Sequence, residues 1–138
     1  MKRILFGMLV VSGMFLTASV ALAHHSAAAK YDADKPITLT GKVTKVEWMN
    51  PHIYFYIDAA DESGETFNWA VEGSTPNQLY RRGWRRDTLK VGDTITVDAI
   101  MAREPGLKHV NGRSVVLADG RRVFSGSASD GLPVPETN

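Results

Sequence analysis

Apolar and polar residues alternate in a series of short segments between residues 37 and 124, and this two-residue period is typical of β-strands with one buried face. The pattern predicts five strands, each ending near a turn signal. They cover residues 37–48, 53–58, 67–71, 94–101 and 115–117, and Asp119-Gly120 predicts a hairpin that leads to a short sixth strand at 123–124. Because every strand alternates, we expect a closed or nearly closed barrel with one filled interior.

Two departures from simple alternation refine the expected fold. The alternation of apolar and polar residues shifts by one position between Val43 and Val46. One extra residue near Lys45, a β-bulge, would restore the alternation and curve a long first strand. After the third strand, Ser74-Thr75-Pro76 offers a capping hydroxyl with proline at the first helical position, and Gly83 suits the end of a short helix. Three strands, a helix and two or three further strands are the layout of the OB-fold, a five-stranded Greek-key barrel. We therefore expect an all-β, OB-fold-like barrel of five to six strands, with an open meander sheet as the alternative.

The first 23 residues have the three parts of a secretory signal peptide. Lys2 and Arg3 precede an apolar stretch, which ends in the small-residue sequence Ala21-Leu22-Ala23. An uncleaved membrane anchor is the alternative, but a small-residue cleavage sequence has no purpose in an anchor. We expect cleavage after Ala23, a periplasmic or secreted location, and no stable membrane anchor in the mature protein.

Composition limits the class of protein further. The 138 residues carry 16 basic and 15 acidic side chains, and without the first 23 residues these become 14 and 15. Such a near-neutral chain lacks the basic excess that would favour nucleic acid as a partner, and we expect none. The absence of cysteine excludes disulfides and thiolate chemistry, so a hydrophobic core must stabilise this single domain. We assign residues 24–36 to an N-terminal arm, 37–124 to the barrel and 125–138 to a disordered tail.

Cleavage after Ala23 would give the mature chain an unusual first residue. Its α-amine would lie beside the imidazoles of His24 and His25, and amine and imidazole nitrogens are good ligands for copper, zinc and nickel. The amine and imidazole of His24 could chelate one copper ion, with a distant imidazole completing the site. Alternatively, the amine, the intervening amide and His25 could bind Cu(II) in a square plane. His52, in the Asn50-Pro51-His52 turn, is the candidate distant ligand. In the alternative interpretation, His24 and His25 are only the start of a flexible arm, and His52 is a half-exposed turn residue hydrogen-bonded to Asn50 or to a backbone group.

A second group of residues could bind an anionic ligand. Four arginines surround one tryptophan between residues 81 and 86, and two tyrosines lie on one face of the second predicted strand. Basic groups with aromatic neighbours can bind phosphate or stacked rings. The weaker candidate ligand-binding residues are therefore Tyr54, Tyr56, Arg81, Arg82, Arg85 and Arg86. In the alternative interpretation Trp84 is a plug under the barrel and the arginines are solvated or paired with Asp87 and Glu72.

Several motifs together resemble those of an uncharacterised family of small exported proteobacterial proteins, a domain of unknown function. They include His24-His25-Ser26, Tyr31-Asp32, Val46-Glu47-Trp48, Asn50-Pro51-His52, Asn68-Trp69, Arg82-Gly83-Trp84 and Asp119-Gly120-Arg121. The resemblance implies export and a compact β-barrel-like domain, and it implies no activity. The His-His-Ser start and the Trp-x-Asn-Pro-His turn both belong to the family pattern.

Taken together, these observations predict an exported, non-enzymatic binding protein. No catalytic residues are predicted, because Ser26 and His25 lie in the arm and no Gly-rich phosphate loop is present. The first hypothesis is a transition-metal protein, with copper held through His24 and His52. The alternatives are an OB-fold interaction module for an anionic envelope component, oligomeric ligand or partner protein, and a structural accessory.

Overall fold

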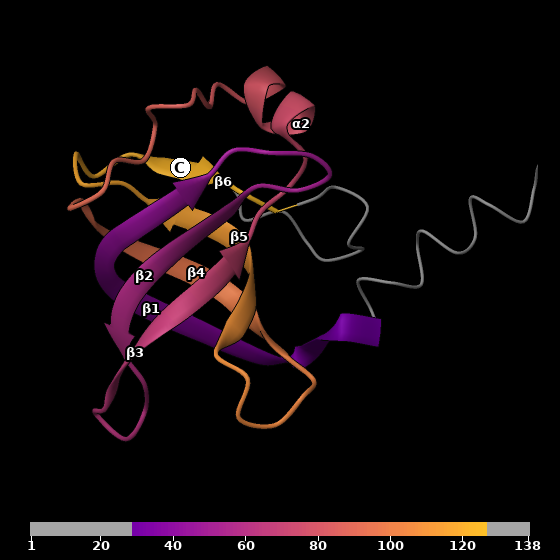
Figure 1. Ribbon diagram of the computed structural model, residues 1–138, viewed down its shortest axis with the longest axis vertical. Helices are drawn as coiled ribbons and strands as arrows, with labels where there is room; N and C mark the ends of the chain where they lie inside the picture. The colour runs from indigo at the N-terminus through magenta and orange to yellow at the C-terminus, as the bar shows by residue number, and fades with distance from the viewer. Residues whose placement is uncertain (1–28, 127–138) are drawn as a thin grey trace, which may run out of the picture.

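The computed structural model describes residues 29–126, which form a curved, mostly antiparallel barrel with a short helix at one end (Figure 1). The elements are β1 (Tyr31–Glu47), β2 (Tyr54–Ala60), β3 (Thr66–Glu72), α2 (Pro76–Arg81), β4 (Thr94–Ala102), β5 (His109–Val116) and β6 (Arg122–Phe124). Within the described residues, no helix is both long and apolar enough to cross a membrane.

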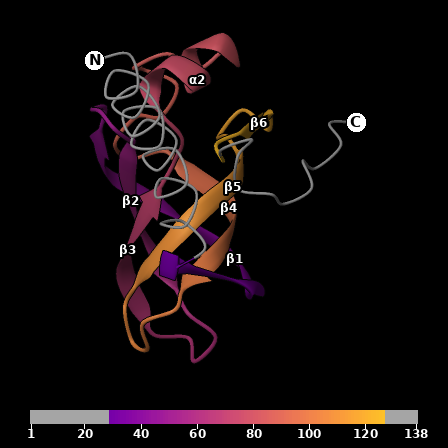
Figure 2. The ribbon, with the colours of Figure 1, turned by 90° about the vertical axis from the view of Figure 1, so that its right-hand side faces the viewer.

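The strand order defines an OB-fold. β1 pairs with both β2 and β4, β2 pairs with β3, and β4 pairs with β5, all antiparallel. A parallel pairing of β3 with β5 closes the barrel, and α2 lies between β3 and β4 in the chain. In the side view of Figure 2, β4 and β5 cross the sheet formed by β2 and β3, as closure of a five-stranded barrel requires. The predicted OB-fold-like barrel with one helix between the third and fourth strands is confirmed.

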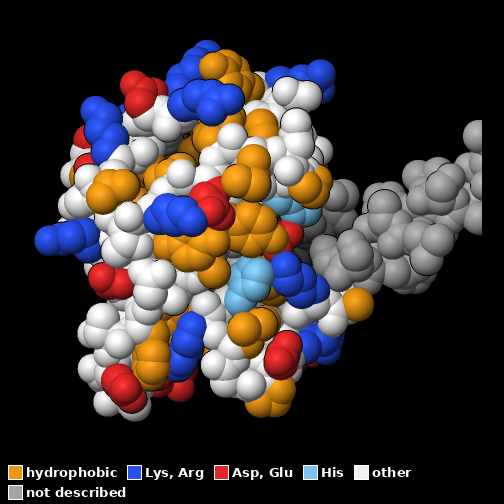
Figure 3. All heavy atoms as spheres, in the orientation of Figure 1, with side chains coloured by type: hydrophobic (Ala, Val, Ile, Leu, Met, Phe, Trp, Pro, Cys, Tyr) orange, Lys and Arg blue, Asp and Glu red, His pale blue; other side chains and the backbone are white. Residues whose placement is uncertain are grey.

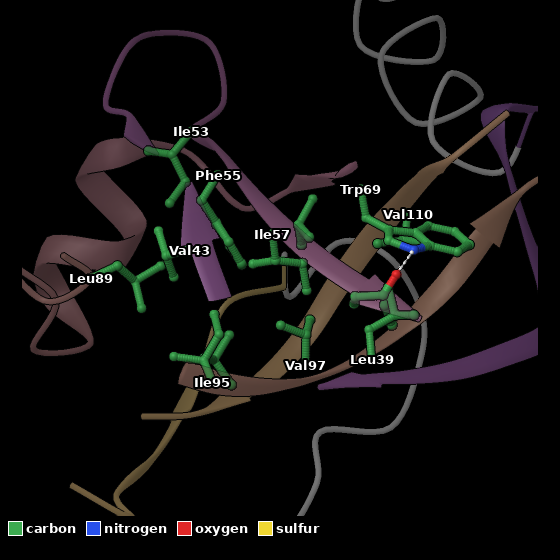
Figure 4. Packing of buried hydrophobic residues seen from close by; sticks show 14 of the residues in the cluster. Leu39, Val43, Ile53, Phe55, Ile57, Trp69, Leu89, Ile95, Val97 and Val110 are labelled. Atoms are coloured by element: carbon green, nitrogen blue, oxygen red, sulfur yellow. Dashed lines mark hydrogen bonds between the residues drawn. The ribbon is translucent and has the colours of Figure 1, made fainter. Parts of the chain in front are cut away.

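The barrel is filled by the alternating apolar residues of all its strands. Figure 4 shows that side chains from β1, β2, β3, β4 and β5 converge on one interior. Trp69 is one of the two largest residues of this core, and its indole N–H donates to the Ala59 carbonyl at 3.1 Å. The register of β1 with β2 shifts between Val43 and Lys45, which confirms the predicted bulge. This bulge lets one long strand belong to both sides of the barrel.

The helix forms as the sequence predicts. Thr75 is the N-cap and its hydroxyl accepts from the Gln78 amide, Pro76 occupies the first turn, and Gly83 follows the helix with φ of +89°. Trp84 then enters the end of the barrel, where it is 1% exposed and its indole N–H donates to the Phe124 carbonyl at 3.0 Å. The plug interpretation of Trp84 therefore agrees with the structure.

The barrel starts earlier and ends later than the sequence pattern indicates. β1 begins at Tyr31, so the prediction that residues 31–36 belong to an irregular arm is wrong. The pattern missed this part of the strand because its residues 32–36 carry mostly exposed polar side chains, whereas Tyr31 is 3% exposed. Ser125, assigned to the tail, is fully buried and its amide donates to the Arg113 carbonyl. The remainder of the predicted tail lies outside the described residues, as does most of the predicted arm and the whole predicted signal peptide.

β5 also begins earlier, at His109, where the sequence indicates a polar loop continuing through Asn111-Gly112. These two residues are in a strand that pairs with β4 on one side and β3 on the other. A Cβ atom at position 112 would lie 2.8 Å from a methyl carbon of Val71. Glycine is therefore required there by the close approach of two strands, and its presence is not the sign of a turn.

Candidate functional site

A buried carboxylate, that of Glu72, organises the polar cluster on the outer face of the barrel. Glu72 is the last residue of β3 and lies directly opposite Tyr54 of β2, and it is 6% exposed. Because side chains alternate along β3, Glu72 lies on the face opposite to the core side chains Trp69 and Val71. It is nevertheless buried, because Lys30, Tyr31, His52, Tyr54 and His109 surround it.

Both oxygens of this carboxylate accept hydrogen bonds. Oε2 accepts from the Tyr31 hydroxyl at 2.5 Å, from the Lys30 ammonium at 2.7 Å and from the Tyr54 hydroxyl at 2.7 Å. Oε1 accepts from Nδ1 of His52 at 2.5 Å. Burial by itself would raise the pKa of Glu72, but the Lys30 ammonium and the other three donors lower this pKa to about 2. Glu72 is therefore an anion at neutral pH, and burial together with its carboxylate raises the pKa of the Tyr54 phenol above its usual value.

This network determines which ring nitrogen of each histidine carries a lone pair. When His52 is neutral, its Nδ1 donates its proton to Glu72, and Nε2 is left as the lone-pair nitrogen. The Tyr31 hydroxyl gives its only proton to Glu72, so Nε2 of His109, 3.1 Å from that oxygen, acts as the donor. The lone pair of His109 then lies on Nδ1. Burial, together with the nearby Lys30 ammonium, lowers the pKa of His109 and so favours the neutral form of this ring.

His52 is the only predicted metal ligand among the described residues, and its surroundings differ from the expected ones. It follows the Asn50-Pro51 turn between β1 and β2, and its side chain is 37% exposed. Its partner is the Glu72 carboxylate, in place of the expected Asn50 or backbone group. A carboxylate that binds one ring nitrogen and leaves the other free is the arrangement that orients metal-binding histidines in proteins.

The predicted ligands His24 and His25 lie outside the described residues, but the chain that leads to them can be followed to Lys30. The ammonium of Lys30 and the imidazole of His52 bind the two oxygens of the same carboxylate. Within residues 29–126, no group of three or more His, Cys, Asp or Glu side chains is arranged to hold a metal ion. A metal bound at His52 would therefore need ligands from another segment.

The tyrosines of the predicted ligand-binding face are both paired with carboxylates. Tyr54 donates to Glu72, whereas the Tyr56 hydroxyl donates to Glu47 at 2.9 Å and its ring lies 5.2 Å from the Lys45 ammonium. The structure thus joins Tyr54 to His52, which sequence analysis treated as parts of separate sites. In Figure 3 the two His side chains of the described region are visible on one face, with hydrophobic and charged side chains between and beside them.

Within the described part of the chain, two of the four arginines are held by backbone carbonyls and aromatic rings, and the other two are not. Arg82 donates to the Gly126 carbonyl at 2.7 Å and its guanidinium lies 4.2 Å from the centroid of the Phe124 ring. Arg85 donates to the Trp84 carbonyl at 2.6 Å and lies 4.7 Å from the centroid of the Tyr80 ring. Arg81 and Arg86 are exposed and pair with no carboxylate in residues 29–126. The expected pairing of arginines with Glu72 is wrong, because Lys30 occupies that position.

The centre of the cluster does not stand out in the sequence. Glu72 and Lys30 are not among the predicted site residues, and His109 is only a weaker candidate ligand in the loop expected after the fourth strand. In the structure β5 brings His109 beside Tyr31. The alternation of side chains along the third strand could have indicated Glu72, because it puts this residue on the same face as Tyr54 of the neighbouring strand.

The strand order, the closing β3–β5 pair and the helix position define a protein of the OB-fold class, with a polar cluster on its outer face. The chain belongs to DUF6152, a family of unknown function, whose model matches residues 13–110. This match confirms the resemblance to a family of unknown function, and it spans His24, His52, Glu72 and His109.

The chain is also similar to a solved structure, that of the mitochondrial single-stranded DNA binding protein Rim1 from S. cerevisiae. The two share 13% sequence identity with a TM-score of 0.43, over 67% of this chain and 97% of the other. No curated protein matches the sequence.

Proposed function

We propose that this protein is an exported, non-enzymatic OB-fold protein that binds one copper ion through the mature N-terminus at His24 and Nε2 of His52. The observation that carries the proposal is the sharing of Glu72: one oxygen binds His52 and the other binds Lys30. The carboxylate therefore orients a candidate ligand and anchors the segment that leads to the other ligands.

The anchor at Lys30 shortens the distance that the N-terminal segment has to cover. His24 precedes Lys30 by six residues, which span about 20 Å when fully extended. The α-amine and imidazole of His24 thus have sufficient reach to meet Nε2 of His52. A short tether to an anchored residue also raises the effective concentration of the terminal ligands at His52.

The ligand set suits copper better than harder cations. An amine and two imidazoles are nitrogen donors, which Cu(II) prefers in a tetragonal geometry. His25 supplies a further imidazole, and in the second geometry it replaces that of His24. Export would be consistent with such a site, because the α-amine becomes available only after cleavage behind Ala23.

The experiment uses protein that begins at His24, titrated with Cu(II) and measured by calorimetry and EPR spectroscopy. We expect one ion per chain, and we expect His24→Ala and His52→Ala each to weaken binding at least about tenfold and to change the EPR spectrum. His109→Ala is the matched control, since it removes another imidazole from the same face. If His52→Ala leaves both affinity and spectrum unchanged, the joint site does not exist and only terminal chelation remains.

A second candidate function is supported by one observation: the guanidinium groups of Arg81 and Arg86 are exposed and pair with no carboxylate of residues 29–126. These groups favour an anionic envelope component or partner protein as a ligand. Titration with a polyanion at two salt concentrations tests this candidate, because the arginine contribution should fall as salt rises. Arg81→Gln and Arg86→Gln should remove the salt-dependent part and leave copper binding unchanged.

A further inference from the structure

A groove lies between the turn that follows β1 and the outer side of α2. It has a volume of about 310 Å³, and its lining consists of Trp48, Met49, Asn50, Pro76, Asn77, Tyr80 and Arg86. Met49 is 53% exposed and Tyr80 is 47% exposed, so two of the four large exposed hydrophobic side chains of residues 29–126 lie in this groove. Concentration of exposed apolar side chains in one hollow indicates a binding surface.

The chemistry of the groove restricts what could fill it. The rings of Trp48 and Tyr80 lie 6.2 Å apart in an edge-to-face contact, so together they form an aromatic wall of the groove. Arg86 adds a positive charge that no described carboxylate neutralises, and the lining contains no acidic residue. Grooves lined by aromatic side chains bind extended proline-containing segments, whose rigid backbone loses little entropy on docking. A carboxylate next to the proline would pair with Arg86.

We propose that the C-terminal segment of the same chain, residues 132–136, binds in this groove. Its sequence is Leu-Pro-Val-Pro-Glu, which combines two prolines and two aliphatic side chains with one carboxylate, that of Glu136. The prolines suit the aromatic wall of Trp48 and Tyr80, and Glu136 is complementary in charge to Arg86. This inference is independent of the metal proposal, because it involves none of the proposed ligands.

The position of the last described residues brings this segment within reach. The Ser125 carbonyl accepts from the Ser74 amide at 2.8 Å, just before α2, and the Gly126 carbonyl accepts from Arg82, just after it. Figure 1 shows the described chain ending at the same end of the barrel as α2 and the turn after β1. From Gly126 to Leu132 there are six residues, which extend about 20 Å, whereas a helix with its side chains is about 10–12 Å across. The segment can therefore pass round α2 to the groove.

The chain has no cysteine, so Val134→Cys provides a single attachment site for a nitroxide spin label in the full mature protein. The reporter is the indole N–H signal of Trp48 in the NMR spectrum. The indole of Trp69 is the internal control, because it is buried and donates to the Ala59 carbonyl, and neither residue lines the groove. We expect the Trp48 signal to lose most of its intensity when the label is active and to recover when the label is reduced.

Substitutions of groove residues distinguish specific binding of the C-terminal segment from chance proximity of the spin label to Trp48. Tyr80→Ala and Arg86→Gln should each restore much of the Trp48 signal, whereas Arg81→Gln, on an exposed arginine outside the groove, should not. An unaffected Trp48 signal, or broadening that persists in both groove variants, would overturn the proposal. Broadening of isotope-labelled chains by separate spin-labelled chains would also overturn it, since the occupant would then come from a second copy.

Discussion

Replacement of Glu72 by glutamine is the perturbation that separates an organising carboxylate from an ordinary surface ion pair. The pKa of Glu72 is about 2 in the folded protein, against an ordinary value of 4.5. This difference corresponds to about 3 kcal/mol, and we reduce it to about 2 kcal/mol because the Lys30 side chain is 41% exposed and partly screened by solvent. At pH 7, Glu72→Gln should lower the free energy of unfolding by about 2 kcal/mol.

The pH dependence of this loss has a definite sign. A carboxyl group whose pKa is lower in the folded protein stabilises the fold when ionised, so the contribution is complete above pH 4.5. It falls as the pH approaches 2, and about half of it is lost by pH 3. The difference in unfolding free energy between the wild type and Glu72→Gln should therefore narrow with acid. Urea denaturation at pH 7 and pH 3 measures it.

The same substitution should change the tautomer of His52. If the amide oxygen accepts from Lys30, Tyr31 and Tyr54, the amide N–H₂ group faces Nδ1 of His52, which must then become an acceptor. The ring proton moves to Nε2, and that nitrogen can no longer bind a metal. The ¹⁵N chemical shifts of the ring report this exchange directly.

Glu47→Gln is the matched control, because Glu47 also accepts from a tyrosine and a lysine on this side of the barrel but is more exposed. It should leave the stability near that of the wild type and the His52 tautomer unchanged. An equal loss of stability at pH 7 and pH 3 in Glu72→Gln, or an unprotonated Nε2 in that variant, would refute the reasoning.

Three further predictions concern the fold and His109. Gly41→Ala should destabilise the barrel by about 3 kcal/mol in chemical denaturation, since the new Cβ atom would lie 2.1 Å from the Asp58 carbonyl oxygen; near-wild-type stability would contradict this close approach. Thr75→Ala should cost about 1 kcal/mol in the same assay, because the hydroxyl that accepts from the Gln78 amide is lost; Thr75→Ser should recover most of it. His109 should titrate below its ordinary pKa of 6.5 in an NMR titration because it is buried near Lys30, and a value above 6.5 would show that Glu72 dominates instead.

The fold was predictable from sequence wherever a strand has one buried and one exposed face. β2, β3 and β4 have this character, and their two-residue period indicated each of them. For β5 the period indicated only the end of the strand and missed its start at His109, because both edges of this strand are paired and most of its side chains, including Arg113 and Ser114, are buried. It failed for the start of β1 because residues that pair with only one neighbour can keep their polar side chains in solvent.

The candidate site was predictable only in part, for a related reason. His52 stood out because it follows a proline in a turn, and such positions lie at a barrel rim. Its partner Glu72 is 20 residues further along the chain, and nothing local distinguishes it from other acidic residues. Lys30 and Tyr31 reach it only because β1 extends beyond its predicted start. Contacts of this kind depend on strand register, which the sequence pattern did not determine for these residues.

The central claim is that the α-amine of His24 and the imidazole of His52 bind the same copper ion. The most direct measurement is the Cu(II) affinity and EPR spectrum of protein that begins at His24, compared with protein extended by one alanine before it. We predict that the extension weakens binding at least about tenfold, and that His52→Ala weakens it much less in the extended protein than in the unextended one. Equal affinities and identical spectra with and without the extra residue would contradict the claim.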